Sequence, residues 1–166
     1  MARRTADEAI DFEALYRTSR DDVYAFVAGM LRDRAGAEEV TAAAFERALT
    51  KRSSYRPGRG SPRAWLFGIA RNAAYDELRR RGRAEPVAEP EERSAPQGDA
   101  TAEVAVRRAA LADALARLSR EERELVALRF EAGLSGAETG AVLGISESNV
   151  GTRLSRAMAK LREAMG

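Results

Sequence analysis

Short hydrogen-bonding side chains are concentrated in the stretch GISESNVGTRLSR, residues 144–156, where they alternate with apolar residues at helical spacing. Arginine and asparagine can form paired hydrogen bonds with purine edges, whereas serine, threonine and lysine suit phosphate oxygens. Small residues also let a helix backbone approach a duplex closely. The candidate contact residues on this helix are Ser146, Ser148, Asn149, Thr152, Arg153, Arg156 and Lys160.

Helix-start and helix-stop signals surround this stretch. Ser119 with Glu122, and Ser135 with Glu138, are spaced as capping boxes, and Gly133 stands where a helix should stop. We therefore expect helices over residues 121–132, 136–143 and 147–164, the last two joined by a tight glycine-containing turn. This is the helix-turn-helix pattern. The alternative is an amphipathic helix whose polar face is merely solvated.

The core face of the last helix follows from its apolar spacing. Apolar side chains recur at steps of three and four residues, which is typical of a helix with one buried stripe. The predicted core residues are Val150, Leu154, Ala157, Met158, Leu161 and Met165.

A second basic region, residues 51–83, carries ten basic and only two acidic residues, with aromatic residues among them. Basic side chains follow a phosphate backbone, and aromatic faces stack on unpaired bases. Ser61-Pro62 is a good helix start. On that helix we expect Trp65 to pack in the core, whereas Arg71, Asn72 and Tyr75 are candidates to face nucleic acid. Tyr55 is expected to be exposed, because its loop is rich in glycine, proline and arginine.

Composition favours an all-α protein and excludes several kinds of chemistry. The 166 residues are 45% hydrophobic and include no cysteine or histidine, so disulfides, thiolate or imidazole metal sites and Cys or His catalysis are excluded. No apolar run reaches the roughly 20 residues that span a bilayer, and the N-terminus lacks the apolar segment of a secretory signal. An enzyme such as a metal-dependent nuclease is a further alternative, and its catalytic residues would have to be carboxylates such as Glu38, Glu39 and Asp76. Glu38 and Glu39 are adjacent on a helix and point in different directions, so they are poorly placed to share a metal ion.

The chain divides into two helical blocks. Residues 8–83 and 103–166 have helical patterns, whereas residues 84–102 are acidic and rich in proline. A segment with so few large apolar side chains cannot bury a core, so we interpret it as a flexible linker. An ordered surface loop is the alternative.

These motifs together resemble the bacterial extracytoplasmic-function (ECF) sigma factors. The resemblance covers nearly all of the chain except its ends and the linker. It is carried by FEALYR (12–17), AEEV (37–40), FERAL (45–49), PRAWLFGIARNAAYDELRRR (62–81) and the run from LSREERELV to AKLRE (118–163).

The resemblance implies two small helical domains. Residues 8–83 would be sigma region two, which docks on the clamp helices of core RNA polymerase and recognises and opens the minus-ten element. Residues 103–166 would be region four, which reads the minus-thirty-five element as duplex and meets the polymerase flap. The implied polymerase-binding residues are Glu38, Glu39, Glu46 and Arg47. The implied minus-ten residues are Tyr55, Arg56, Arg59, Arg63, Arg71, Asn72, Tyr75, Arg79 and Arg80.

One position departs from the family pattern. Ala43 stands where a glutamate is common before the phenylalanine of the polymerase-binding helix, so affinity for core would be weaker or carried by the other glutamates. The resemblance implies a cytoplasmic, non-enzymatic protein with no cofactor and no membrane insertion. The resemblance also implies binding of duplex and single-stranded promoter DNA, and regulation by an anti-sigma protein, as is common in the family. A polymerase-independent regulator remains the rival interpretation.

Overall fold

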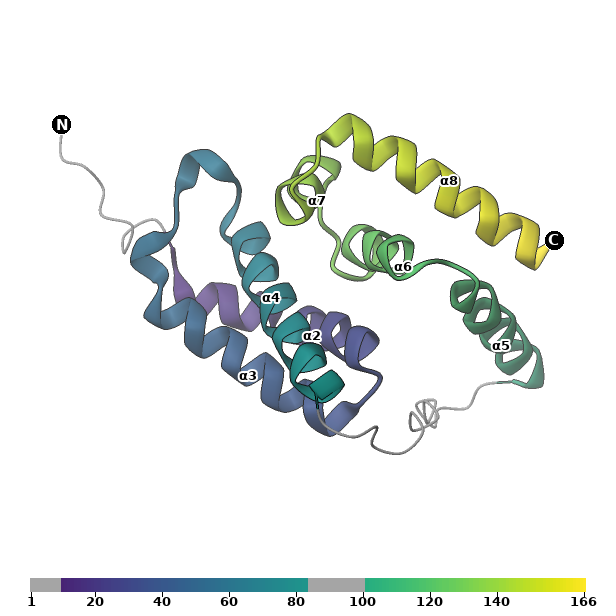
Figure 1. Cartoon of the computed structure of the whole chain (residues 1–166), viewed down its shortest axis with the longest axis horizontal. Helices are drawn as coiled ribbons and strands as arrows, with labels where there is room; N and C mark the ends of the chain where they lie inside the picture. The colour runs from purple at the N-terminus through teal and green to yellow at the C-terminus, as the bar shows by residue number, and fades with distance from the viewer. Residues whose placement is uncertain (1–9, 84–100) are drawn as a thin grey trace.

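The computed structural model describes residues 10–83 and 101–166, and these residues form helices and loops with no strand among them, which confirms the all-α expectation (Figure 1). Residues 8 and 9 and almost all of the predicted linker lie outside the described residues. The helices of the N-terminal block are α2 (Phe12–Leu31), α3 (Arg34–Thr50) and α4 (Pro62–Arg83). Those of the C-terminal block are α5 (Ala102–Ala116), α6 (Arg120–Val126), α7 (Gly136–Leu143) and α8 (Glu147–Met165).

The N-terminal block is a bundle in which α2, α3 and α4 pack against one another. Its centre holds Val23, Phe26 and Val27 of α2 against Leu66 and Phe67 of α4, all of them almost fully buried. The Phe26 and Phe67 rings meet edge to face with centroids 5.6 Å apart, which aromatic pairs prefer over direct stacking. The bundle therefore holds α4 by one face and leaves the rest of it for other contacts.

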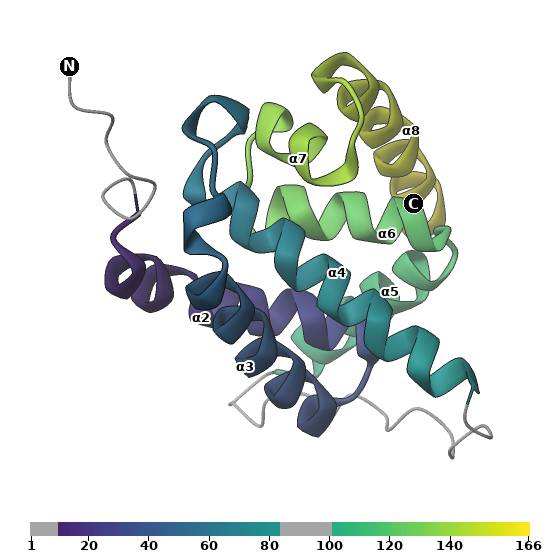
Figure 2. The ribbon, with the colours of Figure 1, turned by 60° about the vertical axis from the view of Figure 1, so that its left-hand side comes forward.

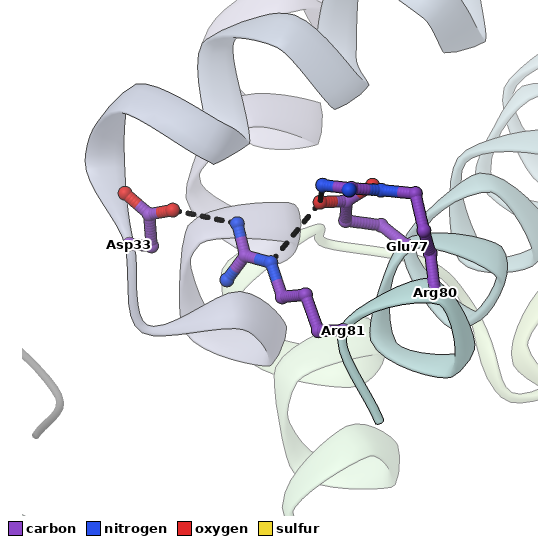
Figure 3. A network of polar contacts seen from close by, with 4 residues as sticks. All are labelled: Asp33, Glu77, Arg80 and Arg81. Atoms are coloured by element: carbon purple, nitrogen blue, oxygen red, sulfur yellow. Dashed lines mark hydrogen bonds and ion pairs between the residues drawn. The ribbon is translucent and has the colours of Figure 1, made fainter. Parts of the chain in front are cut away.

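A polar network fastens the C-terminal end of α4 to the turn between α2 and α3 (Figure 3). Arg81 donates to Asp33 at 2.6 Å and to Glu77 at 3.0 Å, while Arg80 also donates to Glu77. The hydrogen bond from Arg80 lowers the pKa of Glu77 to about 2 despite partial burial. A side chain at Gly36 would meet the ends of the Arg81 and Asp33 side chains, so it would displace their ion pair.

The helix caps of the C-terminal block follow the sequence signals. Ser119 with Glu122, and Ser135 with Glu138, both form complete capping boxes, and Ser146 caps α8. Gly133 and Gly144 adopt positive φ angles of 67° and 70°, the left-handed conformation that ends helices. The α5 helix begins at Ala102, one residue before the expected block, because Thr101 caps it.

The expected helix over residues 121–132 is not one regular α-helix. The α-helical part ends at Val126, and η3 (Ala127–Glu131) is a π-helical turn. The amide of Ala132 bonds to the carbonyl of Ala127 at 2.9 Å, five residues back. The π-helical turn directs Phe130 outward, where it is 57% exposed, and returns Leu128 and Leu134 to full burial.

The two blocks pack directly on each other. Leu128, Ala132 and Leu134 belong to the same buried apolar cluster as the N-terminal bundle, and α7 contacts α4 while η3 contacts α2. Figure 2 shows α6 and α7 lying alongside α4, with α8 beyond them. A second, smaller cluster joins α5 to α8 through Ala114, Leu118, Ala157 and Leu161.

Candidate polymerase and promoter interfaces

The polar face of α8 is exposed to solvent. Ser148, Thr152, Arg153 and Arg156 are exposed, and Asn149 is partly exposed. The Nε of Arg153 donates to Oδ1 of Asn149 at 3.0 Å. This bond fixes the direction of the guanidinium group and leaves its two terminal nitrogens free of intramolecular bonds within the described residues, as paired recognition of a purine requires.

The opposite face of α8 packs in the core, as its apolar spacing predicts. Val150, Ala157 and Leu161 are buried, and Leu154 and Met158 are partly buried. The prediction for Met165 was wrong: it is 50% exposed, because it is the last residue of α8 and extends past the helices that cover the core face.

The tight approach of α7 to α8 depends on a glycine. A Cβ at Gly140 would lie 2.6 Å from the backbone carbonyl oxygen of Ile145 in the turn. Real Cβ atoms do not come so close to backbone oxygen, so only glycine lets the turn fold back here. This contact sets the angle at which α7 presents α8.

Two predicted DNA residues of α8 have structural partners. Ser146 is the N-cap, and its hydroxyl accepts from the amide of Asn149 at 3.0 Å. Lys160 donates to Glu122 at 2.6 Å, and this hydrogen bond is the main reason that the pKa of Glu122 is lowered. Lys160 nevertheless keeps 55% of its side chain exposed.

The predicted acidic surface of α3 is present as a continuous exposed face. Glu38, Glu39 and Glu46 are all exposed, and Ala43 lies partly exposed between them. Arg47 is also exposed and pairs with Asp76 of α4 at 3.3 Å. The main packing partners of α3 are α2 and α4, and this face is turned away from both.

The loop between α3 and α4 differs from the prediction at Tyr55. The side chain was expected to be exposed, but it is 5% exposed. Its hydroxyl donates to the carbonyl of Gly60 at 2.8 Å, and its ring meets Trp65 edge to face at 5.7 Å. Tyr55 thus holds the loop in place, and the exposed side chains beside it include Arg56 and Arg59.

The predicted minus-ten residues of α4 fall into two groups. Asn72, Arg79 and Arg80 are exposed, although Arg79 pairs with Asp76 at 2.7 Å and Arg80 with Glu77. Arg63, Arg71 and Tyr75 are partly buried. Arg63 pairs with Asp22 of α2 at 2.7 Å and also donates to the carbonyl of Ala132, whereas Arg71 and Tyr75 contact the C-terminal block.

Sequence reasoning missed the acidic residue that meets this second group. Glu124 of α6 is 5% exposed; it accepts a hydrogen bond from the Nε of Arg71, and another from the Tyr75 hydroxyl at 2.8 Å. Burial, followed by this hydrogen bond, raises the pKa of Tyr75, which keeps the phenol protonated as a donor. The sequence did contain one signal that Glu124 is buried. Glu124 precedes Leu128 by four residues, so the two side chains lie on the same face of the helix.

A cleft of about 290 Å³ opens between α4 and the C-terminal block. It is lined by Arg71 on one side and by Arg153 and Arg156 of α8 on the other, with Glu121 and Glu124 among its walls. Within residues 10–83 and 101–166, no cluster of three or more potential metal ligands occurs. In the same ranges, no helix is both long and apolar enough to cross a bilayer.

Comparison with known families assigns both blocks. Residues 15–84 match the model of sigma-70 region 2, and residues 108–161 match that of sigma-70 region 4. The chain belongs to the ECF RNA polymerase sigma factors. It is an alternative sigma factor that directs promoter-specific transcription, and sigma factors of this kind bind core RNA polymerase and promoter DNA. The rival interpretation as a polymerase-independent regulator is not favoured.

Individual relatives support this assignment, and their similarity to this chain covers almost its whole length. The RNA polymerase sigma factor CarQ of Myxococcus xanthus is 38% identical over 98% of this chain and 94% of its own. The ECF sigma factor SigL of Mycobacterium tuberculosis is 33% identical over 95% of this chain and 90% of its own.

Solved structures include similar chains in complex with a protein partner. The sigma factor RpoE, in complex with the anti-sigma factor NepR from Bartonella quintana, has a TM-score of 0.73 at 26% identity, covering 93% of this chain and 96% of its own. CnrH, in complex with the cytosolic domain of CnrY, has a TM-score of 0.67 at 26% identity, covering 92% of this chain and 85% of its own.

Proposed function

We propose that the sigma factor divides its work between its two blocks. Residues 8–83 bind core polymerase and open the minus-ten element, and residues 103–166 read the minus-thirty-five element as duplex. The observation that carries the proposal is the exposed polar stripe of α8, held outward by a capped helix-turn-helix in a chain that also carries the acidic face of α3. Tethering both blocks to polymerase raises the effective concentration of each at the promoter.

The acidic face of α3 is the proposed polymerase contact. Glu38, Glu39 and Glu46, with Arg47 beside them, present exposed charge, which suits a reversible contact with the clamp helices. A carboxylate is missing at Ala43, so the remaining glutamates carry the charge of this face. A second contact, between residues 103–166 and the polymerase flap, would place α8 at the minus-thirty-five element.

Promoter opening is assigned to the basic residues of the α3–α4 loop and of α4. Unstacking costs a few kcal/mol per base, and binding of the displaced strand by Arg56, Arg59, Asn72 and their neighbours would offset this cost. Tyr55 would act by holding the loop, since its hydroxyl is bonded to Gly60. Polymerase forms the phosphodiester bonds, and the sigma factor itself uses no cofactor and breaks no covalent bond.

Regulation by an anti-sigma protein is part of the proposal. It is supported by the likeness to RpoE, which was solved with the anti-sigma factor NepR. We place the activity in the cytoplasm, where core polymerase works.

Reconstituted transcription tests the proposed function. Purified sigma factor is mixed with core polymerase from the source bacterium and a pool of its genomic promoter fragments, and transcript starts are sequenced. Controls omit either core or the sigma factor. We expect new starts that share two upstream boxes at fixed spacing. Duplex binding by the chain alone, with no core-dependent starts, would overturn the proposal.

A further inference from the structure

Several polar side chains on the exposed face of α8 already have partners in the protein. The Ser146 hydroxyl caps the helix, and the Thr152 hydroxyl donates to the carbonyl of Ser148 at 3.2 Å. Within residues 10–83 and 101–166, the terminal nitrogens of Arg153 and the guanidinium of Arg156 make no such bond. Contact with base edges is therefore best served by these two arginines.

Asn149 lies one turn before Arg153 on α8, and its side chain is partly exposed. Its Oδ1 accepts from the Nε of Arg153 at 3.0 Å. An arginine nitrogen can only donate, so the amide oxygen of Asn149, and not its nitrogen, must face Arg153. The backbone amide of Asn149 donates to the Ser146 hydroxyl at 3.0 Å, which fixes this acceptor to the first turn of the helix.

The bond to Arg153 competes with direct reading of a base by Asn149. Reading adenine takes both ends of the amide, because the oxygen accepts from N6 while the nitrogen donates to N7. In α8 the oxygen of Asn149 points along the helix toward Arg153. The sequence prediction placed Asn149 in direct contact with DNA, whereas this bond favours an indirect role.

The same bond leaves Arg153 with the donors that match guanine. With Nε engaged, its two terminal nitrogens present N–H donors side by side at the end of the side chain. Guanine offers two neighbouring acceptors, O6 and N7, in the major groove, whereas adenine offers one acceptor and one donor, and arginine has no acceptor. Arg153 also lines the same cleft as Leu143 and Ile145, so apolar side chains flank its aliphatic part.

We propose that Asn149 is a positioning residue, and that through Arg153 it selects guanine at one base pair of the minus-thirty-five element. A long side chain loses rotamer freedom when it binds, and one that Asn149 already holds has less to lose. Asn149 thus strengthens the reading of a base that it does not contact. This inference rests on the proposed reading of the minus-thirty-five duplex by α8.

Transcription from altered templates tests the proposal. One promoter mapped in the reconstituted system is made as a pool in which each base pair of its minus-thirty-five element is replaced in turn, and transcripts are counted for each template. Holoenzymes carry the wild-type chain, Arg153→Ala, Asn149→Leu, Asn149→Asp, or Arg153→Ala combined with Asn149→Leu. The measured quantity is the preference at each base pair, not total transcription.

The wild-type holoenzyme should prefer G:C at one base pair by about 10- to 100-fold, and Arg153→Ala should remove that preference alone. Asn149→Leu should reduce it about fivefold to tenfold, because the guanidinium is no longer held. Asn149→Asp keeps the accepting oxygen, so it should retain the preference while its negative charge lowers transcription from every template. The double variant should match Arg153→Ala, because Asn149 acts only through Arg153.

Glu103→Leu is the matched control. Glu103 accepts from Arg107 at 3.1 Å, one turn later on α5, and both side chains are largely exposed. The change breaks an equivalent bond on another helix of the same block, so the preference at each base pair should not change. If it falls as in Asn149→Leu, the effect belongs to the stability of the block and the inference fails.

A second measurement needs no promoter. In nuclear magnetic resonance spectra of the full chain without DNA, the Nε–H signal of Arg153 is identified by its loss in Arg153→Lys. We expect this proton to exchange with water more slowly than that of exposed Arg156, and the protection to persist in Asn149→Asp but not in Asn149→Leu. Equal exchange at Arg153 and Arg156 in the wild-type chain would overturn the positioning role, even if a variant failed to fold.

The template experiment can overturn the inference in three further ways. It fails if the base pair sensitive to Arg153→Ala is not G:C, or if Arg153→Ala lowers transcription from all templates evenly, as loss of a phosphate contact would. It also fails if Asn149→Leu abolishes a preference that Arg153→Ala leaves intact. If the wild-type chain gives no core-dependent starts, the proposed function fails, and the exchange measurement decides the positioning role by itself.

Discussion

The helices α8 and α4 carry the two predicted DNA surfaces, and they are presented in opposite ways. The polar stripe of α8 is exposed, with Arg153 already oriented by Asn149. On α4, by contrast, Arg63, Arg71 and Tyr75 are bonded to the C-terminal block. Both surfaces belong to one chain and have similar residue types, so residue type alone does not decide whether a surface is available.

The difference matches the kind of DNA that each surface is proposed to bind. Duplex DNA is always present, and a helix that reads it needs only to be rigid and open. A displaced strand exists only after melting, and a basic, aromatic surface left open would attract any single strand. The surface of α4 is covered by an acidic side chain of the same protein, whereas the surface of α8 is exposed, which agrees with this difference between the two kinds of DNA.

The largest expected effect comes from a change at Gly140, because this residue allows α7 to approach the turn before α8. Gly140→Ala places a methyl group against the Ile145 carbonyl, and we expect it to destabilise the C-terminal block by about 3 kcal/mol, the upper part of the range for overpacking. Thermal melts followed by circular dichroism report all helices, and Trp65, the single tryptophan, reports the N-terminal bundle.

Gly68→Ala on α4 is the matched control for Gly140→Ala. A Cβ there meets nothing within 4 Å, so the substitution should stabilise the helix by about 0.5–1 kcal/mol. Equal destabilisation by both variants would show that the Ile145 contact is not the cause.

The next effect concerns the open surface itself. Arg153→Ala should reduce minus-thirty-five duplex binding about 10- to 100-fold, because one paired contact with a base contributes about 1–3 kcal/mol of discrimination. Binding is measured by anisotropy with promoter and scrambled duplexes. Arg162→Ala, an exposed arginine in the last turn of α8, should change it little. A similar loss in both variants would indicate general charge attraction only.

A smaller effect tests how the end of α4 is held. The pKa of Glu77 is lowered from 4.5 to about 2, so its contribution to stability is present above pH 4.5 and is lost as pH falls toward 2. Glu77→Gln should cost about 1–2 kcal/mol at pH 7 and little at pH 2. Urea unfolding across this pH range provides the measurement.

Glu13→Gln is the control for Glu77→Gln. It removes an ion pair with Arg17 whose side chains are 85% and 72% exposed, and such pairs contribute little. If the stability difference between Glu77→Gln and wild type did not shrink at low pH, the network in Figure 3 would not stabilise the fold.

The smallest effect separates stability from DNA approach on α8. Gly151 is exposed, and a Cβ there meets nothing within 4 Å. Gly151→Ala should therefore stabilise α8 by up to about 1 kcal/mol while weakening duplex binding, if the backbone at this point lies against DNA. Melting and anisotropy on one preparation measure both. Unchanged binding would place the DNA on another side of the helix.

Local signals in the sequence predicted the caps and turns of the C-terminal block closely. Ser135, Glu138 and Gly144 act within a few residues of themselves, so their roles are visible in the sequence. The exposed polar stripe of α8 was predictable for the same reason. The functional roles assigned to these residues stay predictions.

Features that depend on distant partners were not predictable. Tyr55 is buried because Trp65 and Gly60 lie beside it in the fold, and its glycine- and proline-rich neighbours gave the opposite indication. Glu124 needed the packing of α6 on α4 before its partners were defined. The π-helical turn was also missed, because it satisfies core packing at Leu128 and Leu134 rather than any local preference.

The π-helical turn bears on how the length of the chain can vary. Its hydrogen bond, from the amide of Ala132 to the carbonyl of Ala127, encloses one residue more than the bond of an α-helix does. Deleting a single residue between 127 and 131 would leave the same two groups four residues apart, the spacing of a regular α-helix. Ala132 and Leu134 would then keep their direction toward the shared core, so this segment should accept the loss of one residue more readily than a regular helix would.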